Sequence, residues 1–168
     1  MSPTEPAKPA HMNPFFAAIL AAFVVLSAAA VGNVATFAGL QPWYGSLSKP
    51  FFTPPNWVFG PAWSVLYLLM TIAFWRVLTR PRGFSGRGVA IMWFVVQMVL
   101  NGAWSVAFFG LQSPLLGLFT IGALILALVA TIFTFLKVDR PAGLILVPYL
   151  AWVAFATALN AGVWWLNR

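Results

Sequence analysis

Rings and amides, rather than acids and bases, are the chemically useful side chains that this sequence places at helical spacing. Gln97, Asn101 and Trp104 follow one another at intervals of four and three residues, and Ser105 and Phe108 continue the same face of a predicted helix. Indoles offer flat faces for stacking and one N–H donor each. Amides can orient a carbonyl or a propionate group. The pattern indicates recognition of a flat, largely apolar ligand.

Two further stretches present rings in the same way. Trp63 and Tyr67 are four residues apart, and Tyr149, Trp152 and Ala156 share one helical face with an amide, Asn160, one turn further on. Trp63 and Trp152 each lie several residues inside a predicted helix beside small residues. That position favours the wall of a ligand cavity for both indoles.

Structural roles remain open for some of these side chains. Gln97 and Asn160 could serve only to join helices by hydrogen bonds. Trp164 and Trp165 close the last apolar run, a position typical of the aromatic belt at a membrane interface. Trp43 fits either the belt or the cavity.

Conventional catalysis and metal binding find little support in the ionisable residues. The acids are Glu5 and Asp139, the one histidine is His11, and there is no cysteine. None of the three lies within a long apolar run. Proton relays and ion-coupled transport usually need carboxylates or histidines inside the membrane, metal sites need clustered ligands, and nucleophilic catalysis needs an adjacent base. We expect no metal site and no conventional active site.

The composition places the chain in the membrane. Hydrophobic residues make up 62% of the sequence and charged residues 7%, whereas soluble chains carry about 25% charged residues. Stretches without Asp, Glu, Lys or Arg cover residues 12–48, 50–75, 88–136 and 141–167. The net charge of +7 comes from basic residues at the ends of these stretches, where they meet lipid headgroups. Membrane lipid is therefore an expected partner and nucleic acid is not.

The apolar stretches predict an all-α integral membrane protein with a single bundle of five transmembrane helices. Residues 88–136 are too long for one crossing, and the turn at 110–114 divides them. A polar N-terminal tail, residues 1–13, precedes the membrane domain, residues 14–168. Ser27–Ala30 resembles a signal-peptide cleavage site, but the apolar run continues to about Leu40, so we expect a retained first helix. The expected helices cover residues 15–38, 57–78, 89–109, 115–136 and 142–166.

Basic residues divide unequally between the two sides of such a bundle. Seven are expected on the side of the N-terminus and two, Lys49 and Arg168, on the other. The positive-inside rule then places the N-terminus in the cytoplasm, and a bacterial cell membrane is the expected location. The seven are Lys8, Arg76, Arg80, Arg82, Arg87, Lys137 and Arg140.

The connection at residues 39–56, which we call the aromatic loop, differs from the others. Residues 43–67, which include most of it, hold eight aromatic residues, four prolines and one charge. Each proline fixes φ near −65° and restricts its neighbour. The composition predicts a stiff lid, and the first wall of an aromatic pocket.

Three long stretches resemble the TspO/MBR family, the translocator proteins, also called tryptophan-rich sensory proteins or peripheral benzodiazepine receptors. The first is Trp43–Tyr67, with its Lys-Pro, Pro-Pro and Gly-Pro pairs between tryptophans. The others are Gln97–Gly110 and Pro148–Asn160. The similarity runs from about residue 14 to the end.

The resemblance implies a five-helix bundle with a ligand pocket under the first loop. It implies binding of tetrapyrroles such as protoporphyrin IX and haem as ligands, with no cofactor required, and of benzodiazepine-type molecules. Homodimers are common in the family, and some members are reported to degrade porphyrin in light. By position, the pocket residues would be Gly32, Thr36, Tyr44, Trp57, Trp63, Asn101, Trp104, Trp152 and Ala156.

The function expected from these features is that of a membrane receptor or sensor for tetrapyrroles and similar flat hydrophobic molecules. A transporter of porphyrins or small hydrophobes is an alternative, and so is a light-dependent porphyrin-degrading catalyst. Only the last would make Trp63 and Trp152 catalytic. A sterol motif proposed for some members needs a tyrosine near the end of the fifth helix, and residues 159–168 contain none.

Overall fold

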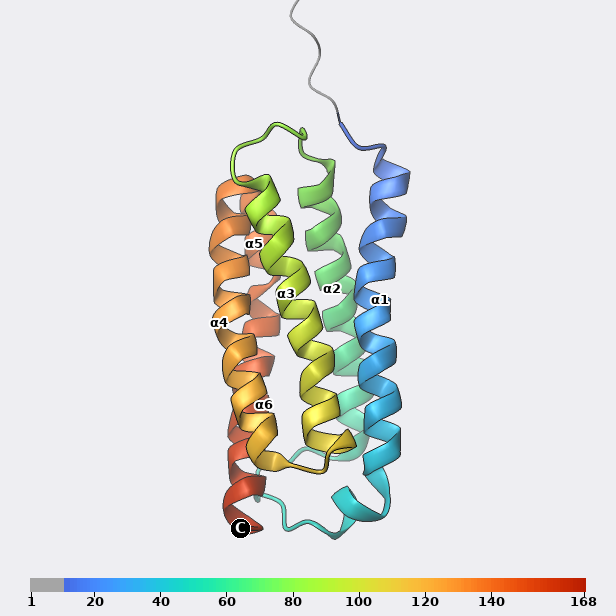
Figure 1. Cartoon of the computed structure of the whole chain (residues 1–168), viewed down its shortest axis with the longest axis vertical. Coiled ribbons are helices and arrows are strands. Elements are labelled where there is room, and N and C mark those ends of the chain that lie inside the picture. Colours follow the sequence, from blue (N-terminus) through green and yellow to red (C-terminus); the bar gives the residue numbers. More distant parts are fainter. Residues whose placement is uncertain (1–10) are drawn as a thin grey trace, which may run out of the picture.

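A computed structural model describes residues 11–168 as one upright bundle of helices (Figure 1). Five segments are long and apolar enough to cross a membrane, so the predicted all-α integral membrane bundle is confirmed. Most of the predicted polar tail, residues 1–10, lies outside the described residues. The helices are α1 (Pro14–Gly39), α2 (Phe59–Thr79), α3 (Arg87–Ser105), α4 (Pro114–Val138), α5 (Arg140–Ile145) and α6 (Val147–Leu166), with α5 and α6 in one crossing.

Three of the helices begin with the same local chemistry. Asn13 caps α1 by accepting hydrogen bonds from two backbone N–H groups, Ser113 caps α4, and Asp139 caps α5. A proline follows each cap within the first two helical positions. Capping side chains satisfy the free N–H groups of a first turn, and proline costs nothing there.

The last crossing differs from the single helix predicted over residues 142–166. It is divided into α5 and α6 around Leu146. Pro148 lies in the first turn of α6. Because proline has no N–H, the carbonyl of Leu144 loses its helical partner at that point, and the chain restarts the helix one residue before the proline.

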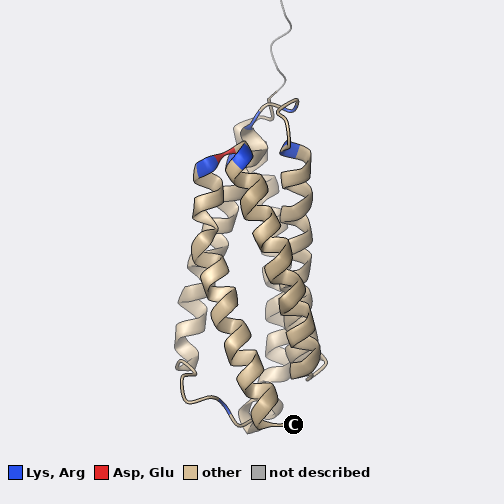
Figure 2. Cartoon of the chain, turned by 90° about the vertical axis from the view of Figure 1, so that its left-hand side faces the viewer, with Lys and Arg blue, Asp and Glu red and all other residues tan. Residues whose placement is uncertain are grey.

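Charged residues gather at the end of the bundle where α1 begins, which we call the N-terminal end (Figure 2). There Asp139 accepts hydrogen bonds from Arg76, at 3.0 Å, and from Arg80, at 2.6 Å. Burial raises the pKa of Asp139, but these hydrogen bonds and one from the backbone N–H of Ala142 outweigh it, so the pKa lies below its usual range. The cluster joins the end of α2 to the start of α5.

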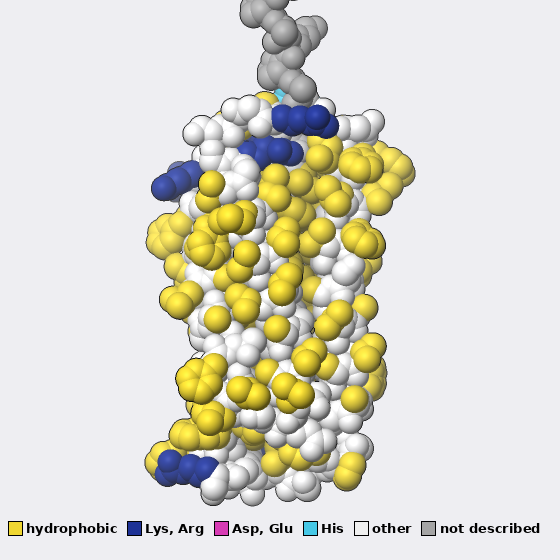
Figure 3. All heavy atoms as spheres, in the orientation of Figure 1, with side chains coloured by type: hydrophobic (Ala, Val, Ile, Leu, Met, Phe, Trp, Pro, Cys, Tyr) yellow, Lys and Arg dark blue, Asp and Glu magenta, His cyan; other side chains and the backbone are white. Residues whose placement is uncertain are grey.

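The half of the bundle near this end is solidly packed. Phe74, Phe94 and Phe135, from α2, α3 and α4, are at most 2% exposed, and their rings stack in sequence. The face of the molecule seen in Figure 3 is largely hydrophobic, with basic side chains at its two ends. A lipid-facing exterior around a packed interior is what five apolar spans require.

A candidate ligand cavity between α1, α2 and α6

The half of the bundle nearer the end of α6, the C-terminal end, contains a cavity of about 770 Å³. We call it the central cavity. It lies between α1, α2 and α6 and is closed on a fourth side by the end of α3. Its volume lies within the range of about 300–1,000 Å³ that is usual for small-molecule sites. Eight aromatic residues line it: Tyr44, Phe59, Trp63, Tyr67, Trp104, Phe108, Phe109 and Trp152.

One wall is built by α2 and α6. Trp63 stacks on Tyr67, with ring centroids 5.1 Å apart, and meets Trp152 edge to face at 6.4 Å. Phe59 adds a further edge contact to Trp152 at 5.9 Å. These ring contacts hold both indoles in place beside the cavity. This wall presents indole surface to the cavity.

The opposite wall depends on a local change of helix type. After α3 the chain forms a π-helical segment, Val106–Gly110, closed by a 2.7 Å hydrogen bond from Leu111 to Val106. The wider turn brings Phe108 and Phe109 to the cavity together, and Phe108 stacks on Trp104 at 5.5 Å. π-Helical turns often mark functional sites.

Close backbone packing holds this wall in place. The carbonyl of Phe109 lies where a Cβ atom on Gly39 would stand, so only glycine lets α1 approach the segment. Tyr44 lies in the segment Leu40–Tyr44, where the chain kinks at Gln41, and reaches Phe109 at a ring distance of 5.4 Å. The end of α1 thereby forms a corner of the central cavity.

Some polar groups in the lining already have hydrogen-bond partners within the protein. Trp104 donates its indole N–H to Asn160 at 3.1 Å, and Asn160 donates in turn to the carbonyl of Pro114. The hydroxyls of Ser64 and Thr71 donate to carbonyls of their own helix. Within residues 11–168, the indole N–H groups that have partners are those of Trp75 and Trp104. The N–H groups of Trp63 and Trp152 therefore remain available to a ligand.

Asn101 lies behind the wall rather than in it. It is 3% exposed, accepts a hydrogen bond from the Tyr67 hydroxyl at 3.4 Å and donates to the Tyr149 hydroxyl at 2.8 Å. Tyr67 lines the central cavity, whereas Asn101 and Tyr149 do not. Asn101 can therefore position the ring of Tyr67. Gln97, one turn away, is fully buried and has no hydrogen-bond partner among the described residues.

The structure brings together most of the residues expected in the pocket. Two of the nine lie elsewhere: Asn101, as described, and Trp57, which is 74% exposed and is not part of the lining. The residues that line the central cavity are Gly32, Thr36, Tyr44, Trp63, Trp104, Trp152 and Ala156.

Several lining residues were not expected. Asn33 could have been found as a lone amide in the charge-free first span, whereas Tyr67, which also lines the cavity, was already singled out by its four-residue spacing from Trp63. Phe109 carried no such signal, because it reaches the cavity through the π-helical segment.

The aromatic loop contributes to the central cavity only at its ends. Leu40, Tyr44 and Asn56 belong to the lining, and residues 45–55 do not. The middle of the loop lies against α6 instead. Asn167 exchanges two 2.9 Å hydrogen bonds with the backbone of Ser48, and the Pro50 ring occupies the space where a Cβ atom on Gly162 would stand.

The central cavity also borders the lipid-facing surface. Leu26 of α1 and Leu68 of α2 both line it, and they are 61% and 60% exposed. A hydrophobic ligand dissolved in the bilayer meets this side of the cavity directly.

Comparison with known proteins agrees with the resemblance of the motifs. The model of the TspO/MBR family matches residues 18–166. Three relatives cover most of this chain. The tryptophan-rich protein TspO of Archaeoglobus fulgidus is 44% identical, over 85% of this chain and 92% of the relative. The tryptophan-rich sensory protein of Cereibacter sphaeroides is 37% identical, over 88% and 92%. The human translocator protein is 37% identical, over 73% of each chain.

Proposed function

Because the chain belongs to the TspO/MBR family, we propose that it is a membrane receptor or sensor for tetrapyrroles. Protoporphyrin IX and haem are the expected ligands, and other flat hydrophobic molecules would bind in the same place. The tetrapyrrole is the ligand in this proposal, and no resident cofactor is needed for binding.

The observation that carries the proposal is the central cavity with its two aromatic walls. Stacked and edge-on rings from α2 and α6 face rings from the end of α3. Such surfaces suit a wide planar π-system, because ring stacking adds about 0.5–1.5 kcal/mol per pair beyond the burial of apolar area. No lining residue carries a charge, so the ligand body must be largely apolar.

Two free indole N–H groups would orient the ligand. The indole N–H groups of Trp63 and Trp152 have no hydrogen-bond partner within residues 11–168, and both residues line the central cavity. Each can donate one hydrogen bond to a carbonyl or a carboxylate on the ligand edge. The names of the relatives, which refer to sensing and translocation, fit a protein that binds and responds to a membrane-soluble molecule.

The test is titration of the purified protein with protoporphyrin IX in the dark, followed by tryptophan fluorescence. Wild-type protein should bind one porphyrin per chain with quenching of its indoles. Trp63→Ala and Trp152→Ala should each weaken binding, because each leaves a void in the wall. Trp165→Ala is the matched control, since Trp165 lies outside the lining. Full affinity in both cavity variants would exclude the central cavity as the site.

One observation favours a second candidate, light-dependent porphyrin degradation. Trp63 and Trp152 lie 6.4 Å apart, facing the same cavity, and indole is an easily oxidised side chain that could give an electron to a photo-excited porphyrin, with dioxygen as the final oxidant. Phenylalanine at either position keeps the stacking face. Trp63→Phe and Trp152→Phe should therefore bind porphyrin almost as wild type but bleach it far more slowly under light. Equal bleaching rates would exclude this role.

Transport is the remaining alternative. A transporter would move porphyrin into the lumen of sealed vesicles whose membrane contains the protein, whereas a sensor would only bind it. Measuring porphyrin inside such vesicles, with protein-free vesicles as the control, distinguishes the two.

A further inference from the structure

A second hollow lies outside the central cavity, at the C-terminal end of the bundle. It is an open groove of about 620 Å³ between the aromatic loop and α6, which we call the terminal groove. Its lining is formed by Lys49, Pro50, Phe51, Ala161, Gly162, Trp164, Trp165 and Leu166. None of these residues lines the central cavity, so the proposed tetrapyrrole site does not account for it.

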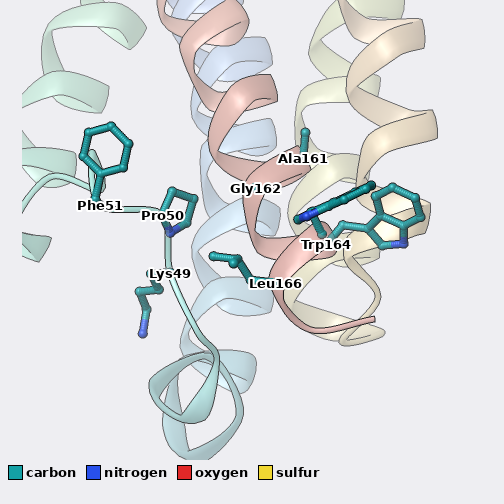
Figure 4. A pocket seen from close by; sticks show the side chains of 8 residues that line it. Lys49, Pro50, Phe51, Ala161, Gly162, Trp164 and Leu166 are labelled. Carbon is teal, nitrogen blue, oxygen red and sulfur yellow. The ribbon is translucent and has the colours of Figure 1, made fainter.

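The terminal groove is firmly built. The loop wall is attached to α6 by the two hydrogen bonds between Asn167 and Ser48 and by the contact of Pro50 with Gly162. Phe52 adds an edge contact to Phe155, with ring centroids 6.4 Å apart. Figure 4 shows the Pro50 ring turned toward α6, with the Lys49 amine directed away toward the end of the bundle.

The depth of the terminal groove in a membrane follows from its position. It lies at the last turns of the crossing that ends at Leu166. Phe51 is fully exposed and Trp165 is 59% exposed, and exposed rings of this kind belong at the level of the lipid headgroups. An apolar groove at that depth opens toward acyl chains below and headgroups above, so a membrane lipid is its natural occupant.

The charges beside the terminal groove select the kind of lipid. Lys49 forms part of the loop wall, and Arg168 lies on the ring of Trp165 in the helix wall, 3.2 Å from its centroid. Lys49 contacts the Tyr44 ring and the carbonyl of Leu47, not an acid. Within residues 11–168 the only carboxylate side chain is that of Asp139. Arg76 and Arg80 bind it at the opposite end of the bundle. The side chains of Lys49 and Arg168 therefore have no carboxylate side chain within residues 11–168 as a partner, and these two cations complement an anionic headgroup.

We propose that the terminal groove binds one anionic phospholipid from the leaflet at the C-terminal end. An acyl chain lies against Phe51, Ala161 and Leu166. The phosphate and the anionic headgroup pair with Lys49 on one wall and with Arg168 on the other.

The experiment uses the purified full chain in detergent, with added phosphatidylglycerol or phosphatidylcholine, and measures bound lipid by native mass spectrometry. Wild-type protein should retain one phosphatidylglycerol in preference to phosphatidylcholine. Lys49→Gln and Arg168→Gln should each weaken phosphatidylglycerol binding about fivefold, because each removes one cation near the headgroup. Binding of phosphatidylcholine should change little.

Arg82→Gln is the matched control, since it removes an exposed cation from the opposite end of the bundle. It should leave lipid retention unchanged. No preference of the wild type for phosphatidylglycerol would overturn the proposal, and so would an equal loss in Arg82→Gln, which would indicate charge attraction without a site.

A second variant tests the terminal groove without altering charge. Ala161→Phe places a ring in the groove and should reduce retention of both lipids. Unchanged retention in this variant would overturn the proposal. An altered oligomeric state with unchanged lipid retention would also overturn it, because the groove would then belong to contact with a second copy of the chain.

Discussion

Two clusters of aromatic rings occupy the two halves of this bundle, and one is closely packed whereas the other borders a cavity. Near the N-terminal end, Phe74 and Phe94 stack almost parallel at 4.1 Å and leave no space between them. Near the other end, Trp63 and Trp152 meet almost at right angles at 6.4 Å and border a cavity. Ring geometry alone does not separate the two clusters, because stacked pairs such as Trp63 with Tyr67 also line the cavity.

The neighbours of the two clusters explain the difference. The phenylalanines pack with large fully buried side chains such as Met70 and Leu128. The tryptophans share their cavity with small residues, Gly32, Gly60 and Ala156. The number of aromatic residues therefore does not distinguish a packed core from a cavity. The size of the neighbouring side chains does.

The largest effect we expect is an all-or-none difference between the two ends. The chain has no cysteine, so Ser46→Cys and Ser85→Cys each introduce a single label site, one near each end. In intact bacterial spheroplasts an impermeant thiol reagent should label Ser46→Cys fully and Ser85→Cys only after the membrane is broken. This result would place the packed half on the cytoplasmic side, as the basic residues predict. The reverse labelling pattern would invert that orientation.

Next in size is the contrast between the two ring clusters in stability. Phe94→Ala should lower the free energy of unfolding by about 3–5 kcal/mol, because it opens a void in a closed stack. Trp152→Ala should cost roughly half as much, since the space it leaves merges with the central cavity. Thermal unfolding in detergent measures both. Equal losses would mean that the cavity wall is packed as tightly as the core.

A smaller effect concerns the charged cluster above the packed half. Asp139→Asn should cost about 1–3 kcal/mol, because Arg76 and Arg80 lose a buried acceptor while keeping some contact with water. The pKa of Asp139 is lowered in the folded protein, so its stabilisation is complete above the usual carboxyl range and is lost as the pH falls through the lowered value. Between about pH 5 and pH 2, the free energy of unfolding should therefore fall more steeply with pH in the wild type than in Asp139→Asn. Parallel curves of unfolding free energy against pH for the two proteins would refute this account.

The smallest effect is expected at the amide behind the cavity wall. Asn101→Ala should weaken ligand binding a few-fold and lower stability by about 1 kcal/mol, the value of a neutral hydrogen bond. Tyr67→Phe removes the hydroxyl from the same pair and keeps the ring. If Asn101 acts by positioning Tyr67, the double variant should bind no worse than either single variant. Additive losses would mean that Asn101 contacts the ligand by another route.

The five crossings could be predicted from the sequence because charge-free runs of membrane length have few alternatives. The break between α5 and α6 was missed, although Pro148 stands at it. Proline is tolerated inside membrane helices as well as at their ends, so its presence did not decide between a kink and a restart.

The candidate site could be predicted where residues lie on regular helices. Trp63, Trp104 and Trp152 occupy the faces that helical spacing gives them. Trp57 could not be placed, since it precedes α2 in a short turn whose direction no periodicity fixes. The aromatic loop was expected to cover the pocket, but its middle lies against α6. This arrangement depends on the contact between Pro50 and Gly162, which are more than a hundred positions apart, so no local sequence pattern predicts it.

The attachment of Ser48 to Asn167 also sets an order of assembly. The central cavity is enclosed by the first two crossings and by the last, and Ser48 finds its partner 119 residues later in the chain. During synthesis α1 and α2 leave the ribosome first, and the cavity-facing rings of α2, such as Trp63, lack their partners on α6 until α6 inserts. The central cavity is therefore completed only in the final step of biogenesis, and a nascent chain that stops before α6 lacks Trp152 and the rest of the side that α6 provides.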